Sequence, residues 1–395
     1  MAPRRLRAMS SPTIAAAAPA PLLDRWRGGA RAVAADFRLD AGLVAIFFAS
    51  RIVVVGAALV AEYLIPRNPA LNPGADGPIL RSLTSWDGWF YLGIVGNGYQ
   101  ADPVAGAYSN VAFPPLFPAL VKLLTLPIPG YAGLVGVLLS NVLFLLALGL
   151  FVRLSTPYIG RRRASLSAGL LVIYPFASVF AMAYSESLFL LLMLATFLAA
   201  ERRHRAWAGI FFALTVLSRT QGVALILPLV ILMLRQDGWR PKLSMTWLAL
   251  GPLAAAAFLV YITGVTGSAT AFLDATHAWG RMGIGNAEPG TTMGAAFTPY
   301  LGALLLTLLA TTFLFVFIRV DRIPIEYALL PILPIVADLL SGSLESVGRH
   351  TMAGFPLLWI LANRRSIAMR RGWPIVSAGL FAIVAVLSFG GYWVP

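Results

Sequence analysis

The stretch Ala41–Ala61, AGLVAIFFASRIVVVGAALVA, decides the fold class, because it is apolar throughout except for Ser50 and Arg51. A run of about 20 apolar residues is long enough to cross the hydrocarbon core of a bilayer as a helix. Comparable runs follow near residues 131–152, 165–183, 186–200, 245–264, 292–318, 323–341 and 374–391. The chain is therefore predicted to be an all-α polytopic membrane protein, in which Arg51 faces the bundle and forms a structural ion pair.

Composition agrees with this class. Of the 395 residues, 59% are hydrophobic and only 12% are charged, and the mean hydropathy is +0.80. The net charge of +14 would suggest a nucleic-acid partner in a soluble chain, but the basic residues form short clusters between apolar runs and no nucleic-acid-binding motif accompanies them. Nucleic acid is therefore excluded as a partner, and the absence of cysteine excludes disulfides and thiolate chemistry.

The basic clusters set the expected topology, because Lys and Arg concentrate in cytoplasmic loops. Residues 1–40 are expected to be a basic, partly disordered cytoplasmic tail, and residues 41–395 one transmembrane domain with an outer loop near 62–130. The region 207–234 should leave and return as two short helices broken near residues 218–222. The Pro-rich run 113–126 should lie on the outer leaflet, and a short helix near 351–362 should return the chain inside. These placements give about eleven membrane helices in the plasma membrane, with the N-terminus inside and the C-terminus outside.

The first outer loop carries the stretch Ser85-Trp86-Asp87-Gly88-Trp89-Phe90-Tyr91, which places one carboxylate among aromatic rings and a glycine. Asp87 is the candidate catalytic residue, a general base. Trp86, Trp89 and Tyr91 are candidate substrate-binding residues, since aromatic rings stack on sugars. Alternatively, Asp87 is a helix-capping residue and the rings are interfacial anchors.

The same topology gathers further polar residues on the outer side, which usually marks a substrate site in a membrane bundle. The candidate substrate-binding residues there are Tyr184, Glu186, Arg219, Gln221, Arg349 and His350. Arg219 and Arg349 are predicted to bind phosphate. Glu186 alternatively interacts only with a helix N-terminus, and Arg349 alternatively extends to the membrane interface. The three histidines have no metal-ligand spacing, so no metal-binding residues and no cofactor are predicted, and whether a metal ion is required stays open.

Five segments, taken in order, resemble the PIG-V type of mannosyltransferase, which adds the second mannose in GPI-anchor synthesis, and its bacterial relatives. The matching segments are Trp86–Tyr91 with Gly98-Tyr99, Phe113–Pro118, Tyr174–Phe189, Ala208–Gly222 and Gly348–Pro356. Two residues depart from the family pattern: His350 stands where Tyr is common, and Ser185 where Thr is common.

The resemblance implies a fold of the membrane glycosyltransferase superfamily called GT-C, with an acid in the first outer loop. It implies an enzyme that transfers mannose from a polyprenyl-phosphate donor to a lipid-linked glycan among the membrane lipids. The Ala- and Arg-rich composition resembles that of a bacterium with a GC-rich genome, which favours a lipoglycan or phosphatidylinositol mannoside as acceptor. A small membrane partner subunit is a further expectation, because some such enzymes need one.

The donor chemistry explains why one acid could suffice. Glycosidases need two carboxylates, one of which protonates an alkoxide leaving group, whereas a phosphate monoester leaves without a proton and needs cations. Asp87 would take the proton of the acceptor hydroxyl, and single displacement would invert the anomeric centre. The alternatives are a lipid-linked sugar flippase, which should show related halves with interrupted helices, and a non-catalytic subunit of a glycosyltransferase complex.

Overall fold

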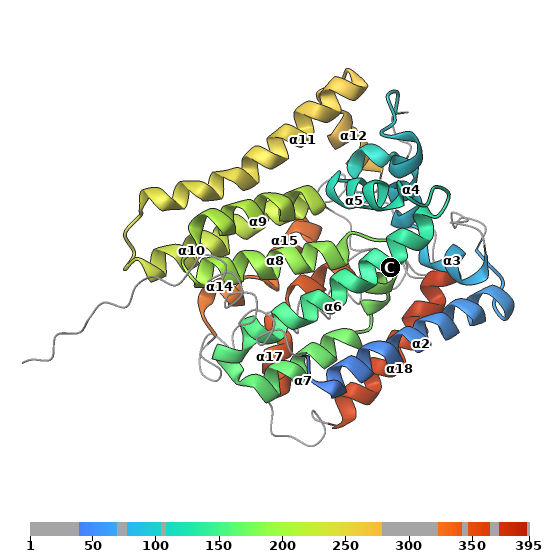
Figure 1. Cartoon of the computed structure of the whole chain (residues 1–395), viewed down its shortest axis with the longest axis horizontal. Coiled ribbons are helices and arrows are strands. Elements are labelled where there is room, and N and C mark those ends of the chain that lie inside the picture. The colour runs from blue at the N-terminus through green and yellow to red at the C-terminus, as the bar shows by residue number, and fades with distance from the viewer. Residues whose placement is uncertain are drawn as a thin grey trace, which may run out of the picture. The chain divides into compact units, whose positions relative to one another are not determined.

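The computed structural model describes residues 39–68, 77–103, 108–278, 323–341, 347–363 and 371–392, and every regular element in these ranges is a helix (Figure 1). The predicted tail and the predicted span 292–318 lie outside the described residues. The elements of the N-terminal half are α2 (Ala41–Tyr63), α3 (Pro78–Leu83), α4 (Asp87–Asn97), η1 (Asn110–Ala112), α5 (Leu116–Thr125), α6 (Ala132–Ile159), α7 (Arg161–Val172), η2 (Ala177–Ala181) and α8 (Glu186–Glu201).

The later elements include the predicted broken hairpin. Its helices end and resume around residue 219, as the sequence indicated. The elements are α9 (Arg205–Ser218), η3 (Thr220–Leu225), α10 (Ile226–Gln236), η4 (Leu243–Ala249), α11 (Leu250–Thr266), α12 (Ala271–Ala278), α14 (Ile325–Ala328), α15 (Ile332–Ser341), α16 (Val347–His350), η5 (Thr351–Ala353), α17 (Pro356–Asn363) and α18 (Trp373–Phe389).

Three helical stretches in the described residues are long and apolar enough to cross a membrane: α2, α6, and η4 with α11. This supports a membrane protein, while the count of about eleven spans stays a prediction. Two expected spans have other boundaries. The run 165–183 is α7 followed by a short 3-10 helix, and the run 323–341 is α14 and α15, interrupted before Ile332. Pro175 and Pro331 lie at these interruptions, where a helix cannot keep its regular hydrogen bonds.

The core is formed by large apolar side chains from helices far apart in sequence. Phe144 of α6 stacks on Phe180 of η2, with ring centroids 4.1 Å apart. Arg51 forms no ion pair among the described side chains, so its predicted ion pair stays a prediction. Its guanidinium lies 4.5 Å from the centroid of the Phe47 ring and donates to the Ser50 hydroxyl across 3.2 Å. An aromatic face stabilises a desolvated cation without a carboxylate.

Helices α8, α9 and α10 position the site, because their chain directions alternate. Helix α8 packs against α9, and α9 packs against α11 (Figure 1). The start of α8 and the end of α9 therefore lie at one end of the bundle. Residues of α4 and α16 join them there through the contacts described below. The end of α18 lies beside the segment that follows α2. There the Asn68 backbone N–H donates to the Gly390 carbonyl across 2.9 Å.

Candidate active site

Asp87 is the first residue of α4, directly after a sharp turn. Trp86 precedes it with φ at +55°, an uncommon conformation for a residue with a side chain. The turn is fixed by Thr84 and Ser85, whose hydroxyls donate to the carbonyls of Leu80 and Ser82. A carboxylate in the first turn also faces the positive end of the helix dipole. The capping alternative is not borne out, because the cap position is occupied by Trp86 and no side chain caps the helix. The Asp87 side chain is therefore left for another partner.

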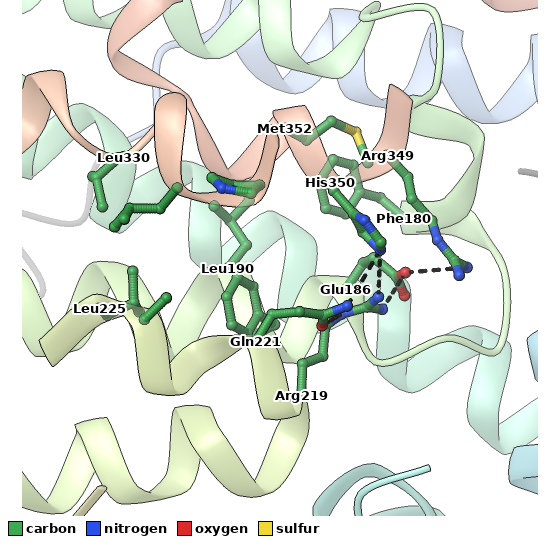
Figure 2. A pocket seen from close by; sticks show the side chains of 14 residues that line it. Phe180, Glu186, Leu190, Arg219, Gln221, Leu225, Leu330, Arg349, His350 and Met352 are labelled. Atoms are coloured by element: carbon green, nitrogen blue, oxygen red, sulfur yellow. Dashed lines mark hydrogen bonds and ion pairs between the residues drawn. The ribbon is translucent and has the colours of Figure 1, made fainter. Parts of the chain in front are cut away.

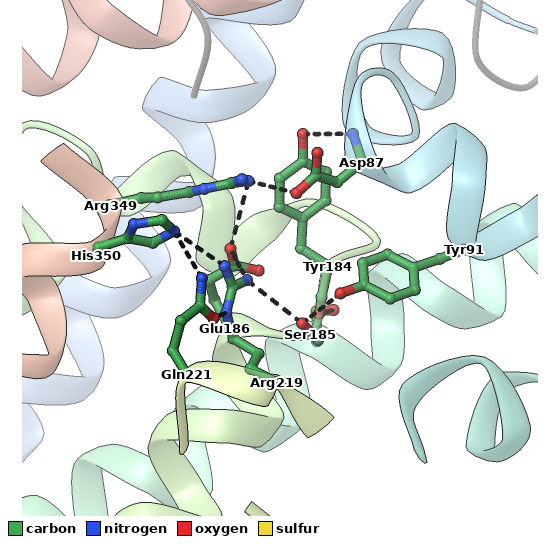
Figure 3. A network of polar contacts seen from close by, with 10 residues as sticks. Asp87, Tyr91, Tyr184, Ser185, Glu186, Arg219, Gln221, Arg349 and His350 are labelled. Atoms are coloured by element: carbon green, nitrogen blue, oxygen red, sulfur yellow. Dashed lines mark hydrogen bonds and ion pairs between the residues drawn. The ribbon is translucent and has the colours of Figure 1, made fainter. Parts of the chain in front are cut away.

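That partner is Arg349, on the four-residue helix α16. Its Nη1 donates to Asp87 Oδ2 across 2.6 Å and lies 3.5 Å from Glu186 Oε1 (Figure 3). All three side chains are buried. Burial alone would lower the pKa of Arg349, but the charges of Asp87 and Glu186 raise it above its usual value. Arg349 is therefore a fixed cation between two acids.

Arg219 forms the second half of this network from the junction of α9 and η3. It forms an ion pair with Glu186 through Nη1, donates to Gln221 Oε1 across 3.2 Å, and contacts His350 Nε2 across 3.2 Å. Arginine has no acceptor atom, so His350 Nε2 must accept this hydrogen bond. His350 is therefore neutral here, with its proton on Nδ1. Glu186 contacts both arginines and is the centre of the network.

Two tyrosines contact residues at and next to the two carboxylates (Figure 3). The Asp87 backbone N–H donates to the Tyr184 hydroxyl across 3.1 Å, and the Tyr91 hydroxyl lies 2.6 Å from Ser185 Oγ. Burial raises the pKa of the Tyr184 phenol well above its usual range, and the Asp87 charge adds to the shift. Tyr184 therefore keeps its proton and holds the start of α4 against the loop before α8.

A pocket opens beside the network, with an empty volume of about 720 Å³ that includes its open mouth (Figure 2). Glu186, Arg219, Gln221, Arg349 and His350 line one part of it. The remaining lining is apolar and comes from η2, α8, η3, the turn between α14 and α15, α15 and the segment after α16: Phe180, Phe189, Leu190, Ala224, Leu225, Leu330, Leu333, Pro334 and Met352. The pocket thus joins two cations to an apolar chamber.

The structure brings together eight of the ten candidate residues: Asp87, Tyr91, Tyr184, Glu186, Arg219, Gln221, Arg349 and His350. Trp86 and Trp89 are placed elsewhere. The Trp86 indole donates to the Ser388 carbonyl across 2.8 Å, which ties α4 to α18, and Trp89 is 44% exposed. Their contact with substrate stays a prediction. Ser185, which the sequence analysis named only as a departure from the family pattern, contacts Tyr91 and Arg219. The apolar pocket wall was not predicted, because apolar residues are common along the whole chain.

No group of three His, Cys, Asp or Glu side chains suited to a metal ion occurs in the described residues. Asp87 and Glu186 are the carboxylates of the site, and the arginines hold both. The expectation that the protein has no cofactor remains a prediction.

Comparison with models of known protein families shows the family of this chain. Residues 37–237, just over half of the chain, match the family model of the mannosyltransferase (PIG-V) type. The chain belongs to the PIG-V mannosyltransferase family. The matched region of this family member contains Asp87, Glu186 and Arg219, whereas Arg349 and His350 lie beyond it. Family membership and the apolar helices together support a membrane glycosyltransferase.

Solved structures of the Archaeoglobus fulgidus oligosaccharyltransferase resemble the chain at low identity. The form tethered to an acceptor peptide is 14% identical, with a TM-score of 0.44, over 88% of this chain and 55% of that one. The archaeal oligosaccharyltransferase AglB, in complex with an inhibitory peptide and a dolichol-phosphate, is 13% identical, with a TM-score of 0.44, over 89% and 56%. The chain thus spans about half the length of these proteins. No curated protein matches it significantly.

Proposed function

We propose that this protein transfers mannose from a polyprenyl-phosphate donor to a lipid-linked glycan on the outer face of the plasma membrane, with inversion at the anomeric carbon. The acceptor class is a lipoglycan or a phosphatidylinositol mannoside. The observation that carries the proposal is the pocket, in which two buried arginines adjoin an apolar chamber.

A polyprenyl phosphate has two parts that this pocket could bind, a charged phosphate and an apolar chain. Its phosphate would accept hydrogen bonds from Arg219 and Arg349, and its isoprenoid chain would lie along Leu225, Leu330 and Leu333. Charge-assisted hydrogen bonds to phosphate are among the strong ones. Gln221 and His350 lie beside Arg219 and would orient its guanidinium.

Transfer would break the bond between the anomeric carbon and the phosphate oxygen, and form a bond from that carbon to the acceptor oxygen. The electron pair of the broken bond leaves with the phosphate, which becomes a monoester. Arg219 and Arg349 would stabilise the added negative charge on it. The acceptor hydroxyl would give its proton to Asp87.

In the resting protein the ion pair with Arg349 engages the carboxylate of Asp87. A donor phosphate would draw on the same guanidinium and weaken its hold on Asp87. Donor binding would therefore prepare the base, and the acceptor would react only in the ternary complex. This sequence would also protect the donor from hydrolysis before the acceptor arrives.

The proposal is tested with purified protein in nanodiscs, using polyprenyl phosphate [³H]mannose and a lipid extract as acceptor. The expected result is transfer of label to a lipid-linked glycan, slowed at least tenfold by Arg219→Gln when the donor is below its KM. Movement of intact donor across a bilayer without transfer would instead assign the protein to lipid-linked sugar flipping. If transfer requires an added membrane protein and is the same with the wild type and with Arg219→Gln, the protein has a non-catalytic role.

A further inference from the structure

A second charged cluster lies at the far ends of the helices that form the candidate active site. Asp237, after the end of α10, accepts from Arg203 across 3.1 Å, from Arg205 across 3.2 Å and from Lys242 across 3.1 Å. Helix α8 separates this cluster from Glu186 by 16 residues, or about 24 Å at the rise of an α-helix. The cluster is thus separate from the pocket described above.

The cluster has more positive charge than its own carboxylate can neutralise. Three cations share Asp237, and this leaves two positive charges in excess. Arg205 is only 9% exposed, and its Nη1 has no hydrogen-bond partner. A buried guanidinium nitrogen without an acceptor costs free energy. A ligand that brings negative oxygens to this point would satisfy the nitrogen and offset the repulsion between the cations.

The backbone holds the cluster in place. Arg203 and Trp239 follow α8 and α10 with φ at +60° and +62°, the left-handed position that usually ends a helix with glycine. Arg203 also donates to the Gln236 carbonyl across 2.7 Å, which ties the two helix ends together. The cations therefore converge in a fixed geometry and are not independent surface side chains.

The surroundings of the cluster are those of a membrane surface. Trp239 is 64% exposed, Trp207 is 57% exposed and Leu243 is 85% exposed, all within a few residues of the three cations. Exposed tryptophans beside basic residues are typical of the level of lipid headgroups. A phosphate at this level belongs most simply to a lipid.

We infer that Asp237, Arg203, Arg205 and Lys242 form a binding site for the phosphate of an anionic phospholipid headgroup, at the end of the bundle opposite the candidate active site. Arg205 and Lys242 would contact the phosphate oxygens, and Asp237 would keep the three cations in position. The site is independent of the transfer reaction, so its test is a binding measurement and leaves the proposed function untouched.

The test titrates dioctanoyl phosphatidylglycerol into the full-length protein in neutral detergent, with binding measured by calorimetry and native mass spectrometry. Arg205→Gln should weaken binding at least tenfold, since a charge-assisted hydrogen bond contributes roughly 1.5–3 kcal/mol. Lys242 is 58% exposed, so Lys242→Gln should fold normally and weaken binding severalfold. Arg162→Gln is the control, because it removes an equal charge from an exposed residue of α7, and it should bind as the wild type does.

Two further ligands identify the source of the phosphate. Dioctanoyl phosphatidylcholine, which has no net charge, should bind at least tenfold more weakly than phosphatidylglycerol, and inorganic phosphate should bind more weakly still. Equal affinity for inorganic phosphate would overturn the lipid assignment and make this a free-phosphate site. Equal phosphatidylglycerol affinity in Lys242→Gln, Arg162→Gln and the wild type, or equal affinity for phosphatidylcholine, would overturn the site itself.

Discussion

Arg349 Nη1 lies 2.6 Å from Asp87 Oδ2, although 262 residues separate the two in sequence. The same nitrogen is 3.5 Å from Glu186 Oε1. One cation thus holds the acid of the first loop against the acid that begins α8. In the resting protein the candidate base is engaged, and a ligand that attracts Arg349 would release it.

Arg349→Gln should destabilise the protein by about 3–5 kcal/mol, because it leaves the buried carboxylate of Asp87 without a counter-charge. Thermal unfolding in detergent measures this effect. Arg81→Gln is the control: Arg81 pairs with Glu62 and is 35% exposed, and pairs near the surface contribute at most about 1 kcal/mol. Adding Asp87→Asn to Arg349→Gln should recover part of the stability. If the loss of stability in the double variant equals the sum of the losses in the two single variants, the pair is not coupled.

Arg219→Gln should raise the KM for the polyprenyl-phosphate donor at least tenfold, because a charge-assisted contact contributes roughly 1.5–3 kcal/mol. The KM for the acceptor should change little. Arg163→Gln, at an exposed position of α7, controls for net charge. An unchanged donor KM in a folded Arg219→Gln protein would make Arg219 only the structural partner of Glu186.

Much of the fold could be predicted from the sequence, and for a physical reason. Apolar runs long enough to span a bilayer predict α2 and α6 closely, and the polar break at 218–222 predicts the junction of α9 and η3. The run 165–183 is equally apolar, so hydropathy did not reveal the end of α7 at Val172.

The candidate site was predictable as a set of residues but not as a network. Charged groups in an apolar chain are few, so Asp87, Glu186, Arg219 and Arg349 stand out in the sequence. Which of them pair depends on helix packing, and spacing along the chain contains no information about it. The pocket wall was not predictable, because Leu330 and Leu333 look the same in sequence as residues that face lipid.

Gly348→Ala should impair both stability and transfer, because a Cβ at this position would lie 2.4 Å from ring atoms of Phe176. The backbone would have to shift to relieve this contact, and the shift would move Arg349, the next residue. Gly379→Ala in α18 is the matched control, since nothing lies within 4 Å of its Cβ. Phe176→Leu should partly restore transfer in the Gly348→Ala protein by making room. Full activity of Gly348→Ala alone would mean that α16 tolerates this shift.

The loop after α4 and the turn before α9 should lie on opposite sides of the membrane. The chain has no cysteine. A single cysteine introduced at the exposed residue Ala101 or His204 is therefore the one thiol that a maleimide can label. In intact cells an impermeant maleimide should label Ala101→Cys and not His204→Cys, which should react only after permeabilisation. Labelling of His204→Cys alone would place Asp87 on the cytoplasmic side.

The central claim is that Asp87 accepts the proton of the acceptor hydroxyl, and Asp87→Asn tests it most directly. The amide keeps the shape of the side chain but cannot take the proton, and a positioned base contributes about 10²–10⁴-fold. The measurement is single-turnover transfer of labelled mannose from polyprenyl phosphate in nanodiscs, with donor binding measured alongside. The account predicts at least a hundredfold slower transfer with donor binding retained. Transfer above about a tenth of the wild-type rate would contradict it and make Glu186 the next candidate for the base.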